Sequence, residues 1–367
     1  MKIECLKDKL LHAVIKADRI AGKKHSLPVL NCLVFEASGG SLSIRATNLD
    51  LGIETSLPVK IIQEGSVAVS GSVVSSFLSN LPSSTLLSFE VKEGNLFISS
   101  GRGGSKALIK AIPHDDFPTI PKPEGKKIVI EAQALRKGFQ SVCFAASASV
   151  VKPELASVFV SIGNGEIVFA ATDSFRLAEK RIPLKGGEGG ESFLVPLRNA
   201  AEILRFLDDV SGTVELRFSK NQLSITGENF HLTSRLIEGV FPDYKQIIPK
   251  ETTTEAVCLR EDVLQTLKLV NVFSNTFNQI TLFFDPPKKL FEARTKNADI
   301  GESSQSVAAA VRGDTLELNF NYHYLIDSLQ PIQTDSVSLS LSGAGRPMIV
   351  RGVSDGSFLY LVMPMNK

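Results

Sequence analysis

The chain has 367 residues, of which 43% are hydrophobic and 22% charged, so it can bury several cores and is not an intrinsically disordered chain. Forty basic residues against 39 acidic ones give a formal charge of +1, which argues against an open, strongly basic nucleic-acid-binding domain. No apolar run approaches the ~20 residues of a membrane helix. Because Met1–His12 also lacks the apolar centre of a signal peptide, we expect a cytoplasmic protein with no membrane partner.

Short stretches of alternating apolar and polar residues run along the whole chain and predict β-strands. Gly- and Asn-containing pairs between many of them predict hairpin turns. Helical patterns are fewer, with one longer and one shorter helix in every ~120 residues, which is an α+β pattern. In chain order, the predicted helices cover 6–20, 73–81, 134–148, 197–207, 260–273 and 320–329, and the clearest strands cover 33–36, 42–46, 86–91, 96–99, 158–162, 167–171, 214–218 and 223–226.

The predicted elements recur along the chain. The tripeptide Ala-Thr-Asn at 46–48 returns as Ala-Thr-Asp at 171–173 and as Ala-Arg-Thr at 293–295, and a Phe-Pro pair at 117 returns at 241. Several such landmarks agree on a period of about 122 residues, which predicts three similar repeats. We place the three domains at 1–124, 125–252 and 253–367, with the proline-rich segments 118–126 and 242–251 as extended linkers between them.

Sequence motifs of enzymes are missing from this chain. It contains no GxxxxGK[ST], GxGxxG, GxSxG or HExxH string. The cysteines at 5, 32, 143 and 258 are too far apart for a zinc ribbon and are expected to be reduced core residues. The His-Asp-Asp string at 114–116 is more typical of a solvated turn than of a metal site. We therefore expect no catalytic residue, no metal and no cofactor.

The small net charge hides an uneven distribution. The predicted helices carry an excess of basic residues, above all in 7–24 and 135–152, so the rest of the chain is net acidic. Basic helices would give a near-neutral protein a surface for a polyanion. Chance placement of charges on solvated helix faces explains the distribution equally well.

Five strings together have a strong family resemblance. They are LPVL at 27–30, ATDSFRLA at 171–178, FPDY at 241–244 followed by IPK at 248–250, TDSV at 334–337 and YLVMPM at 360–365. With these strings the chain resembles the bacterial DNA polymerase III β subunit, the sliding clamp, over essentially its whole length. It departs from the usual ATDGHRLA string at Ser174 and Phe175, and it ends in Asn366-Lys367 where the family usually has Arg-Leu.

The resemblance implies a non-catalytic ring that tethers the replicative polymerase to DNA for processive synthesis. Two chains would join head to tail as a homodimer, with helices lining the hole and sheets outside. Twelve helices at ~10 Å spacing would leave a hole of roughly 28 Å, wide enough for a duplex with water around it. The implied partners are double-stranded DNA, bound without sequence preference, and the DNA polymerase III α subunit, the clamp loader, and other polymerases and repair proteins, which bind through short peptides.

Candidate DNA-binding and dimer residues follow in part from spacing. Arg198 and Arg205 lie seven residues apart and share one face of a predicted helix, where both could meet phosphates. The resemblance adds Lys24 and Lys152 to the DNA-binding residues and places Val272 and Phe273 at the dimer interface. A solvated surface role for the basic residues, and local core packing for Val272 and Phe273, are the alternatives.

The resemblance also implies a pocket for partner peptides between the second and third repeats. Its apolar residues suit an aliphatic or aromatic anchor, the methionines give an adaptable surface, and Arg176 could orient peptide carbonyls or support the floor. Ser174 and Phe175 should reshape its mouth. Ordinary core packing is the alternative for the whole set, which comprises Leu155, Thr172, Ser174, Phe175, Arg176, Leu177, Pro242, Ile247, Val362, Met363, Pro364 and Met365.

Two other classes of protein remain open at this point. One is an enzyme with a scattered active site that motifs do not reveal. The other is a clamp-like paralogue that binds a partner without encircling DNA, although basic helices count against it.

Overall fold

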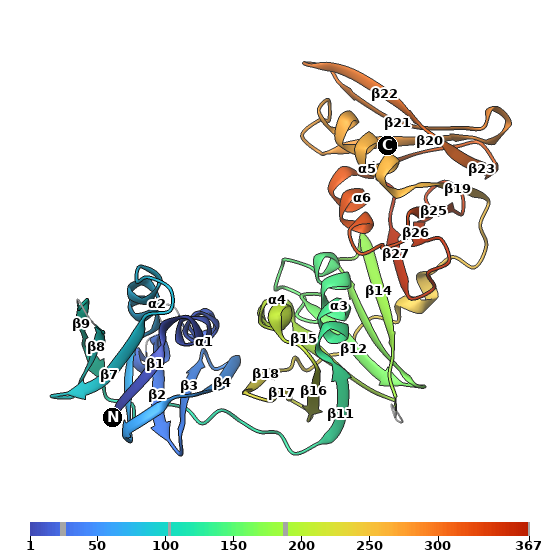
Figure 1. The fold of residues 1–367 in the computed structure, drawn as a ribbon. Coiled ribbons are helices and arrows are strands. Elements are labelled where there is room, and N and C mark those ends of the chain that lie inside the picture. Colours follow the sequence, from blue (N-terminus) through green and yellow to red (C-terminus); the bar gives the residue numbers. More distant parts are fainter. Residues whose placement is uncertain (23–26, 102–103, 186–189, 366–367) are drawn as a thin grey trace. The chain divides into compact units, whose positions relative to one another are not determined.

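The computed structural model describes residues 1–22, 27–101, 104–185 and 190–365. The chain divides into two compact units, one made of Met1–Gln133 with Glu202–Leu236 and the other of Ala134–Ala201 with Ile237–Lys367. Each unit is described separately below (Figure 1). Among the described residues, no helix is both long and apolar enough to cross a membrane.

Six α-helices lie within the described residues, and their positions agree with the longer and shorter helices predicted for each repeat. The helix predicted over 134–148 ends earlier, at Val142, and continues as the 3-10 turn Cys143–Ala145. Beyond it Ser147 and Ser149 bond to nearby backbone groups, which competes with helix continuation. The helices are α1 Lys7–Ile20, α2 Gly71–Ser79, α3 Ala132–Val142, α4 Leu197–Phe206, α5 Arg260–Asn271 and α6 Tyr322–Leu329.

The first unit contains two antiparallel sheets (Figure 1). The five-stranded sheet has the order β5 (Lys60–Gln63), β1 (Lys2–Leu6), β7 (Leu86–Lys92), β8 (Asn95–Ser100) and β9 (Lys106–Ile109). The nine-stranded sheet has the order β10 (Ala111–Ile112), β6 (Gly65–Ser70), β2 (Cys32–Ser38), β3 (Ser41–Thr47), β4 (Leu51–Pro58), β18 (Phe230–Arg235), β17 (Gln222–Gly227), β16 (Thr213–Phe218) and β11 (Lys126–Glu131).

The second unit also contains two antiparallel sheets. Its nine-stranded sheet has the order β15 (Glu191–Pro196), β12 (Ser157–Gly163), β13 (Glu166–Thr172), β14 (Arg176–Pro183), β27 (Phe358–Val362), β26 (Met348–Gly352), β25 (Ser336–Leu341), β19 (Thr254–Leu259) and β23 (Ala309–Gly313). The four-stranded sheet has the order β22 (Gly301–Val307), β21 (Leu290–Asn297), β20 (Gln279–Asp285) and β24 (Leu316–Asn321).

The strand orders repeat three times, so the prediction of three similar α+β repeats is confirmed. One half-sheet occurs as β1-β7-β8-β9, as β11-β16-β17-β18 and as β19-β25-β26-β27. The other occurs as β6-β2-β3-β4, as β15-β12-β13-β14 and as β24-β20-β21-β22. Two strand pairs join successive repeats into continuous sheets, namely β4 with β18 and β14 with β27. We call these pairs the first and the second joint.

The first two repeats share one turn down to its hydrogen bonds. Thr172 Oγ1 donates to the carbonyl of Arg176 over 2.6 Å and accepts the N–H of Ser174 over 3.2 Å. Thr47 Oγ1 makes the same two bonds, to the carbonyl of Leu51 and from the N–H of Leu49. Both turns therefore place their third residue at positive φ, +74° for Leu49 and +80° for Ser174.

The two linkers differ in length and in structure. From the Phe-Pro pair to the next strand the first runs from Phe117 to Lys126 and the second from Phe241 to Thr254, so the second is about four residues longer. In the first, Ile120 is 7% exposed and covers Gly52 of β4. The segment 242–251, expected to be extended, instead contains the 3-10 helix η4, Tyr244–Ile247.

The cores contain apolar residues from every repeat, including the cysteines. Cys5, Cys32 and Cys258 are buried, and all four cysteines are free thiols, as the sequence predicted. Burial raises the pKa of Cys5, Cys143 and Cys258 to about 12, so at neutral pH these thiols stay protonated and unreactive.

Candidate functional site

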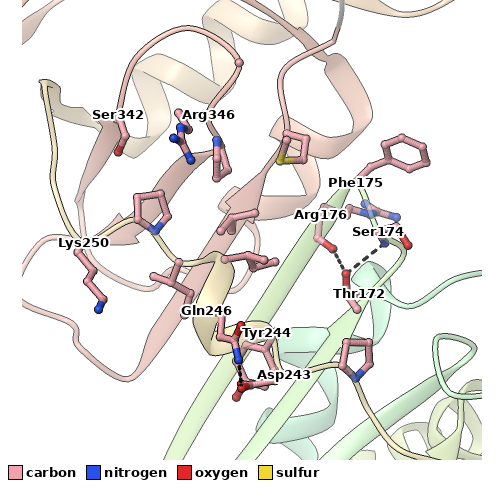
Figure 2. A pocket seen from close by; sticks show the side chains of 18 of the residues that line it. Thr172, Ser174, Phe175, Arg176, Asp243, Tyr244, Gln246, Lys250, Ser342 and Arg346 are labelled. Atoms are coloured by element: carbon pink, nitrogen blue, oxygen red, sulfur yellow. Dashed lines mark hydrogen bonds between the residues drawn. The ribbon is translucent and has the colours of Figure 1, made fainter.

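A cavity of about 920 Å³ opens in the second unit beside the second joint (Figure 2). Strands β13 and β14, the segment around η4, the loop before β12 and the turn before β26 form its walls. Of the residues predicted for the peptide pocket, the cavity is lined by Leu155, Thr172, Ser174, Phe175, Arg176, Pro242, Ile247 and Met363.

The other four predicted pocket residues do not line this cavity. Leu177 and Val362 are fully buried at the second joint, where Leu177 belongs to the core cluster beneath the cavity. The N–H of Met365 donates to the carbonyl of Asn319 over 2.7 Å, so the end of the chain continues toward β24. Pro364 lies in the sequence between the buried strand end at Val362 and Met365.

The turn from Thr172 to Arg176 fixes the rim of the cavity. Asp173 Oδ1 accepts the N–H groups of Phe175 and Arg176 over 2.9 and 3.0 Å. The carbonyl of Phe175 accepts the N–H of Met363 over 2.8 Å, so the last strand is held against the turn. With its backbone bonded on both sides, Phe175 presents a side chain that is 61% exposed.

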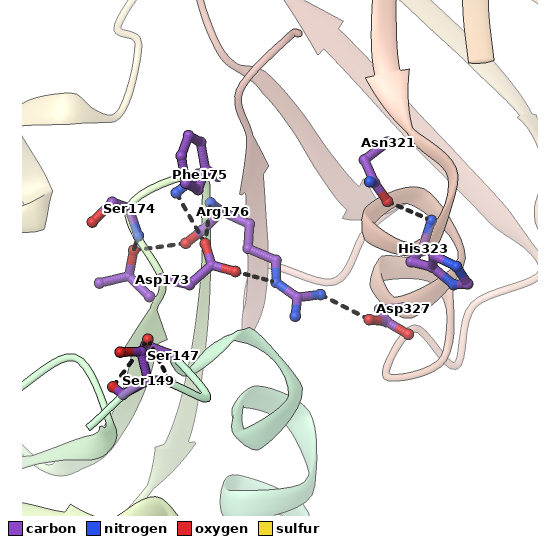
Figure 3. Close-up of polar contacts among 10 residues, drawn as sticks. Ser147, Ser149, Asp173, Ser174, Phe175, Arg176, Asn321, His323 and Asp327 are labelled. Atoms are coloured by element: carbon purple, nitrogen blue, oxygen red, sulfur yellow. Dashed lines mark hydrogen bonds and ion pairs between the residues drawn. The ribbon is translucent and has the colours of Figure 1, made fainter. Parts of the chain in front are cut away.

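Arg176 connects the second repeat to the third (Figure 3). Its Nε donates to Asp173 Oδ2 over 2.9 Å and its Nη1 to Asp327 Oδ2 of α6 over 2.7 Å, while its guanidinium lies 4.3 Å from the ring centre of Tyr324. Burial alone would lower the pKa of Arg176, but the hydrogen bond to Asp327 and the charge of Asp173 outweigh burial and raise it. Of the two roles considered for Arg176, support of the pocket floor is the one that this geometry favours.

Two of the predicted basic residues lie on one helix of the described chain, and a third lies beside the cavity. Arg198 and Arg205 are both exposed on α4, and Arg205 Nη1 lies 2.5 Å from Glu202 Oε1. Lys152 is exposed and lies at the edge of the cavity. Lys24 falls outside the described residues.

The two predicted interface residues follow the end of α5. Val272 is 68% exposed, so local core packing is the wrong explanation for it. Phe273 is half-buried, and its carbonyl accepts a hydrogen bond from Thr295 Oγ1 over 3.2 Å. Phe277, a few residues later, is 70% exposed, so an apolar surface extends along this end of the third repeat.

Family models match the chain from end to end. They describe the N-terminal, central and C-terminal domains of the DNA polymerase III beta subunit and match residues 1–121, 129–243 and 245–366. The chain belongs to this family. The resemblance seen in the sequence is thereby confirmed.

Individual relatives are similar to the chain over 98% or more of their own length. The "Beta sliding clamp" of Bacillus subtilis is 25% identical over 379 residues, covering 100% of both chains. That of Streptococcus pneumoniae is 26% identical and covers 98% of both. The solved β subunit of Thermotoga maritima, 25% identical, has a TM-score of 0.93 over 100% of this chain and 99% of its own. A DnaN sliding clamp from Pseudomonas aeruginosa bound to griselimycin, 24% identical with full coverage of both chains, shares the fold with a TM-score of 0.95.

Membership of the β-subunit family settles the class of function. The chain is a sliding clamp, a non-catalytic processivity factor of DNA replication that binds DNA and polymerase. An enzyme with a scattered active site is therefore excluded.

Sequence reasoning found only part of one wall of the cavity in this clamp, through Pro242 and Ile247. That wall comes from the segment assigned as a linker, and it adds Asp243, Tyr244, Gln246, Ile248, Pro249 and Lys250 to the lining. The FPDY and IPK strings were recognised, but a proline-flanked segment has no periodicity from which a 3-10 helix can be predicted. The signal that could have found it is the extra length of the second linker relative to the first.

Proposed function

We propose that two copies of this clamp close head to tail into a ring around duplex DNA and that the cavity at the second joint receives short partner peptides. The observation that carries the ring is the threefold strand order. Within each chain, the last strand of one half-sheet pairs with the last strand of the next repeat's half-sheet, as β4 with β18 and β14 with β27. The corresponding strands left at the sheet edges are β22 and β9.

Pairing of β22 with β9 of a second copy would repeat the internal joints. It would also cover two edge strands, which are prone to unwanted pairing when left exposed. Because the offered surfaces differ, the contact is heterologous, and two such contacts close a ring.

The internal joints also define a register for this pairing. At the first joint, Gly52 lies opposite Thr233. Followed from strand to strand across the half-sheets, Gly52 corresponds to Glu302, and Thr233 corresponds to Leu108. Glu302 of one copy should therefore lie opposite Leu108 of the next, and both side chains are exposed in the single chain.

The role of Val272 at this interface has support from the second joint. Counted from the first residues of α1, α3 and α5, Val272 corresponds to Phe144. Phe144 packs on Tyr360 of β27 with ring centres 5.8 Å apart, so its position contacts the neighbouring repeat. Val272 is predicted to make the same contact with the next copy, beside Phe273.

Paired cysteines test the ring and its register together. Leu108→Cys with Glu302→Cys should give a covalent dimer of twice 39.7 kDa under mild oxidation. Leu108→Cys with Ser303→Cys is the matched control, because adjacent strand residues point to opposite faces. Equal cross-linking of both pairs contradicts the register, and a chain that sediments as a 39.7 kDa monomer at micromolar concentration contradicts the ring.

DNA contacts are assigned to basic residues of the helices and their neighbours. We assign Lys24, Lys152, Arg198 and Arg205 to phosphates, without base recognition, as a clamp that slides requires. Reversal of charge at Lys24, Arg198 and Arg205 should lower loading and flatten the salt dependence of direct DNA binding. An unchanged salt slope contradicts the assignment.

Peptide binding is assigned to the cavity on the basis of its apolar residues. Leu155, Ile247 and Met363 offer an apolar surface for an aliphatic or aromatic anchor. The proposed ligands are peptides of the polymerase III α subunit, the clamp loader, other polymerases and repair proteins. The proposed location of the protein is the cytoplasm. Of the twelve predicted residues, we assign the eight that line the cavity to peptide contact, and Leu177, Val362, Pro364 and Met365 to its support. We also propose domain boundaries at 1–124, 125–252 and 253–367.

Removal of the chain end tests the peptide site. Deletion of Met363–Lys367 should abolish binding of a fluorescent QLDLF peptide, because it removes Met363 and the bond to Phe175. The dimer should remain, because β22, β9 and α5 are untouched. Undiminished peptide affinity would place the partner site elsewhere.

A further inference from the structure

A buried carboxylate lies next to the cavity wall formed by the segment around η4. Glu179 of β14 is 4% exposed and Tyr244, the first residue of η4, is 5% exposed. Tyr244 Oη donates to Glu179 Oε2 over 2.5 Å. Arg181 Nε donates to Glu179 Oε1 over 2.8 Å, so each carboxylate oxygen has a donor. A buried carboxylate requires such partners, because otherwise its removal from water is not compensated.

The bond between Tyr244 and Glu179 anchors a segment with few other directional contacts. In the described chain, the other hydrogen bonds of 242–248 are internal, such as Tyr244 N to the carbonyl of Pro242 and Gln246 Nε2 to Asp243 Oδ2. The remaining support is apolar packing in a core cluster that also contains Leu177 and Leu361. Phe241 stacks on Phe159 with ring centres 4.9 Å apart, and the ring of Tyr244 meets Phe159 edge-on at 6.5 Å.

Strand β14 therefore supports two sides of the cavity. Near its start, Arg176 is bonded to Asp327 of α6. Three residues later, Glu179 holds η4, whose residues Gln246 and Ile247 line the cavity. Apolar packing has no preferred direction, whereas the hydrogen bond fixes the position of Tyr244 relative to β14.

We propose that Glu179 and Tyr244 are positioning residues of the peptide site, and that they hold η4 in the shape that receives an apolar anchor. The affinity for a peptide then depends on the Tyr244 hydroxyl group, which donates a hydrogen bond to Glu179 of β14. The physical reason is preorganisation: a wall already fixed in the free protein loses less conformational entropy on binding. The inference rests on the peptide-binding function proposed above.

Removal of the single hydroxyl tests the inference. Tyr244→Phe should weaken binding of a fluorescent QLDLF peptide about five-fold and speed amide hydrogen exchange in 244–250, because η4 loses its bond to β14. Tyr322→Phe, the same change on α6 outside the cavity lining, is the matched control and should bind as the unmodified chain does. Thermal unfolding establishes that each variant is folded at the assay temperature.

Two substitutions of Glu179 distinguish the effect of its side-chain length from the effect of its charge. Glu179→Gln keeps the length and an oxygen acceptor, so peptide affinity should stay within two-fold of the unmodified chain. Glu179→Asp keeps the charge but is one methylene shorter, so it should weaken binding as Tyr244→Phe does. This pair decides the question even if Tyr244→Phe does not fold.

The outcomes distinguish this inference from the function on which it rests. Full affinity in folded Tyr244→Phe, or full affinity in Glu179→Asp with loss in Glu179→Gln, overturns the positioning role and leaves the peptide site in place. If the unmodified chain does not bind the peptide, or binds it equally after deletion of Met363–Lys367, the proposed peptide site fails and the inference fails with it.

Discussion

Ser174 holds a backbone conformation that residues with a side chain rarely adopt. Its φ is +80°, in the left-handed region, and the family usually has Gly here. We predict that Ser174→Gly raises the free energy of unfolding by about 0.5–1 kcal/mol, because relief of strain exceeds the extra entropy of an unfolded glycine. Thermal unfolding measures the change. Ser174→Ala is the control and should give no gain, and a gain from Ala instead of Gly would contradict the strain argument.

Asp209 makes part of the stability dependent on pH. His12 Nε2 and Lys16 Nζ both contact its carboxylate. Burial raises the pKa of Asp209, but the hydrogen bonds from Lys16 and His12 outweigh burial and lower the pKa below its ordinary value of 3.8. A carboxylate with a lowered pKa stabilises the folded state at pH values above its unfolded pKa, and this contribution is lost as the pH falls through the folded pKa.

We therefore predict that Asp209→Asn lowers the free energy of unfolding at pH 7 by roughly 0.5–1 kcal/mol, a value reduced because the side chain is 45% exposed. The difference from the unmodified chain should shrink as the pH falls below 3.8 and through the lowered pKa of Asp209. Urea unfolding at a series of pH values measures this difference in the free energy of unfolding. A difference that is constant down to pH 2 would show that the carboxylate charge plays no part.

Helix α3 depends on a glycine for its contact with the sheet. A Cβ on Gly138 would lie 2.3 Å from Cε2 of Phe169 on β13, too close for any real contact. At an exposed helix position Gly→Ala stabilises, but here we predict a loss of about 2 kcal/mol in the free energy of unfolding, because the ring must shift.

The test is thermal unfolding of Gly138→Ala with and without Phe169→Leu. The smaller side chain frees space for the new methyl group, so the double variant should be more stable than the sum of the two single changes predicts. Strict additivity would mean that the ring does not limit the approach of α3.

Local patterns predicted the elements that repeat, and failed where distant segments meet. The six helices follow from periodicity, and the tripeptide that recurs at 46–48 and 171–173 marked the repeat whose two turns share their hydrogen bonds. The buried pair Glu179–Tyr244 is 65 residues apart in sequence and has no local signal, because Glu179 occurs in a charged string that reads as a solvated strand face. The helix predicted to reach 148 shows a second limit, since side chain to backbone bonds of serines override helix propensity.

At the scale of the whole molecule, the proposed ring depends on the end of the third repeat. We predict that Val272→Glu together with Phe273→Glu raises the dimer dissociation constant by about 10- to 100-fold, because charges would be buried at the joint without partners. Sedimentation measures it. Val240→Glu is the control, since Val240 is 88% exposed and does not correspond to a joint position. A dimer that survives the double change would remove Val272 and Phe273 from the interface.

The unequal length of the two linkers has a consequence for valency. In the first repeat Ile120 covers Gly52, whereas the longer second linker leaves a cavity at the second joint. A ring of two chains would thus carry two such cavities, and a protein tethered at one of them would leave the other free for a second protein on the same DNA. Tethering raises the local concentration of each protein at the primer end to roughly the millimolar range, so weak individual contacts suffice and one protein can replace another without leaving the ring.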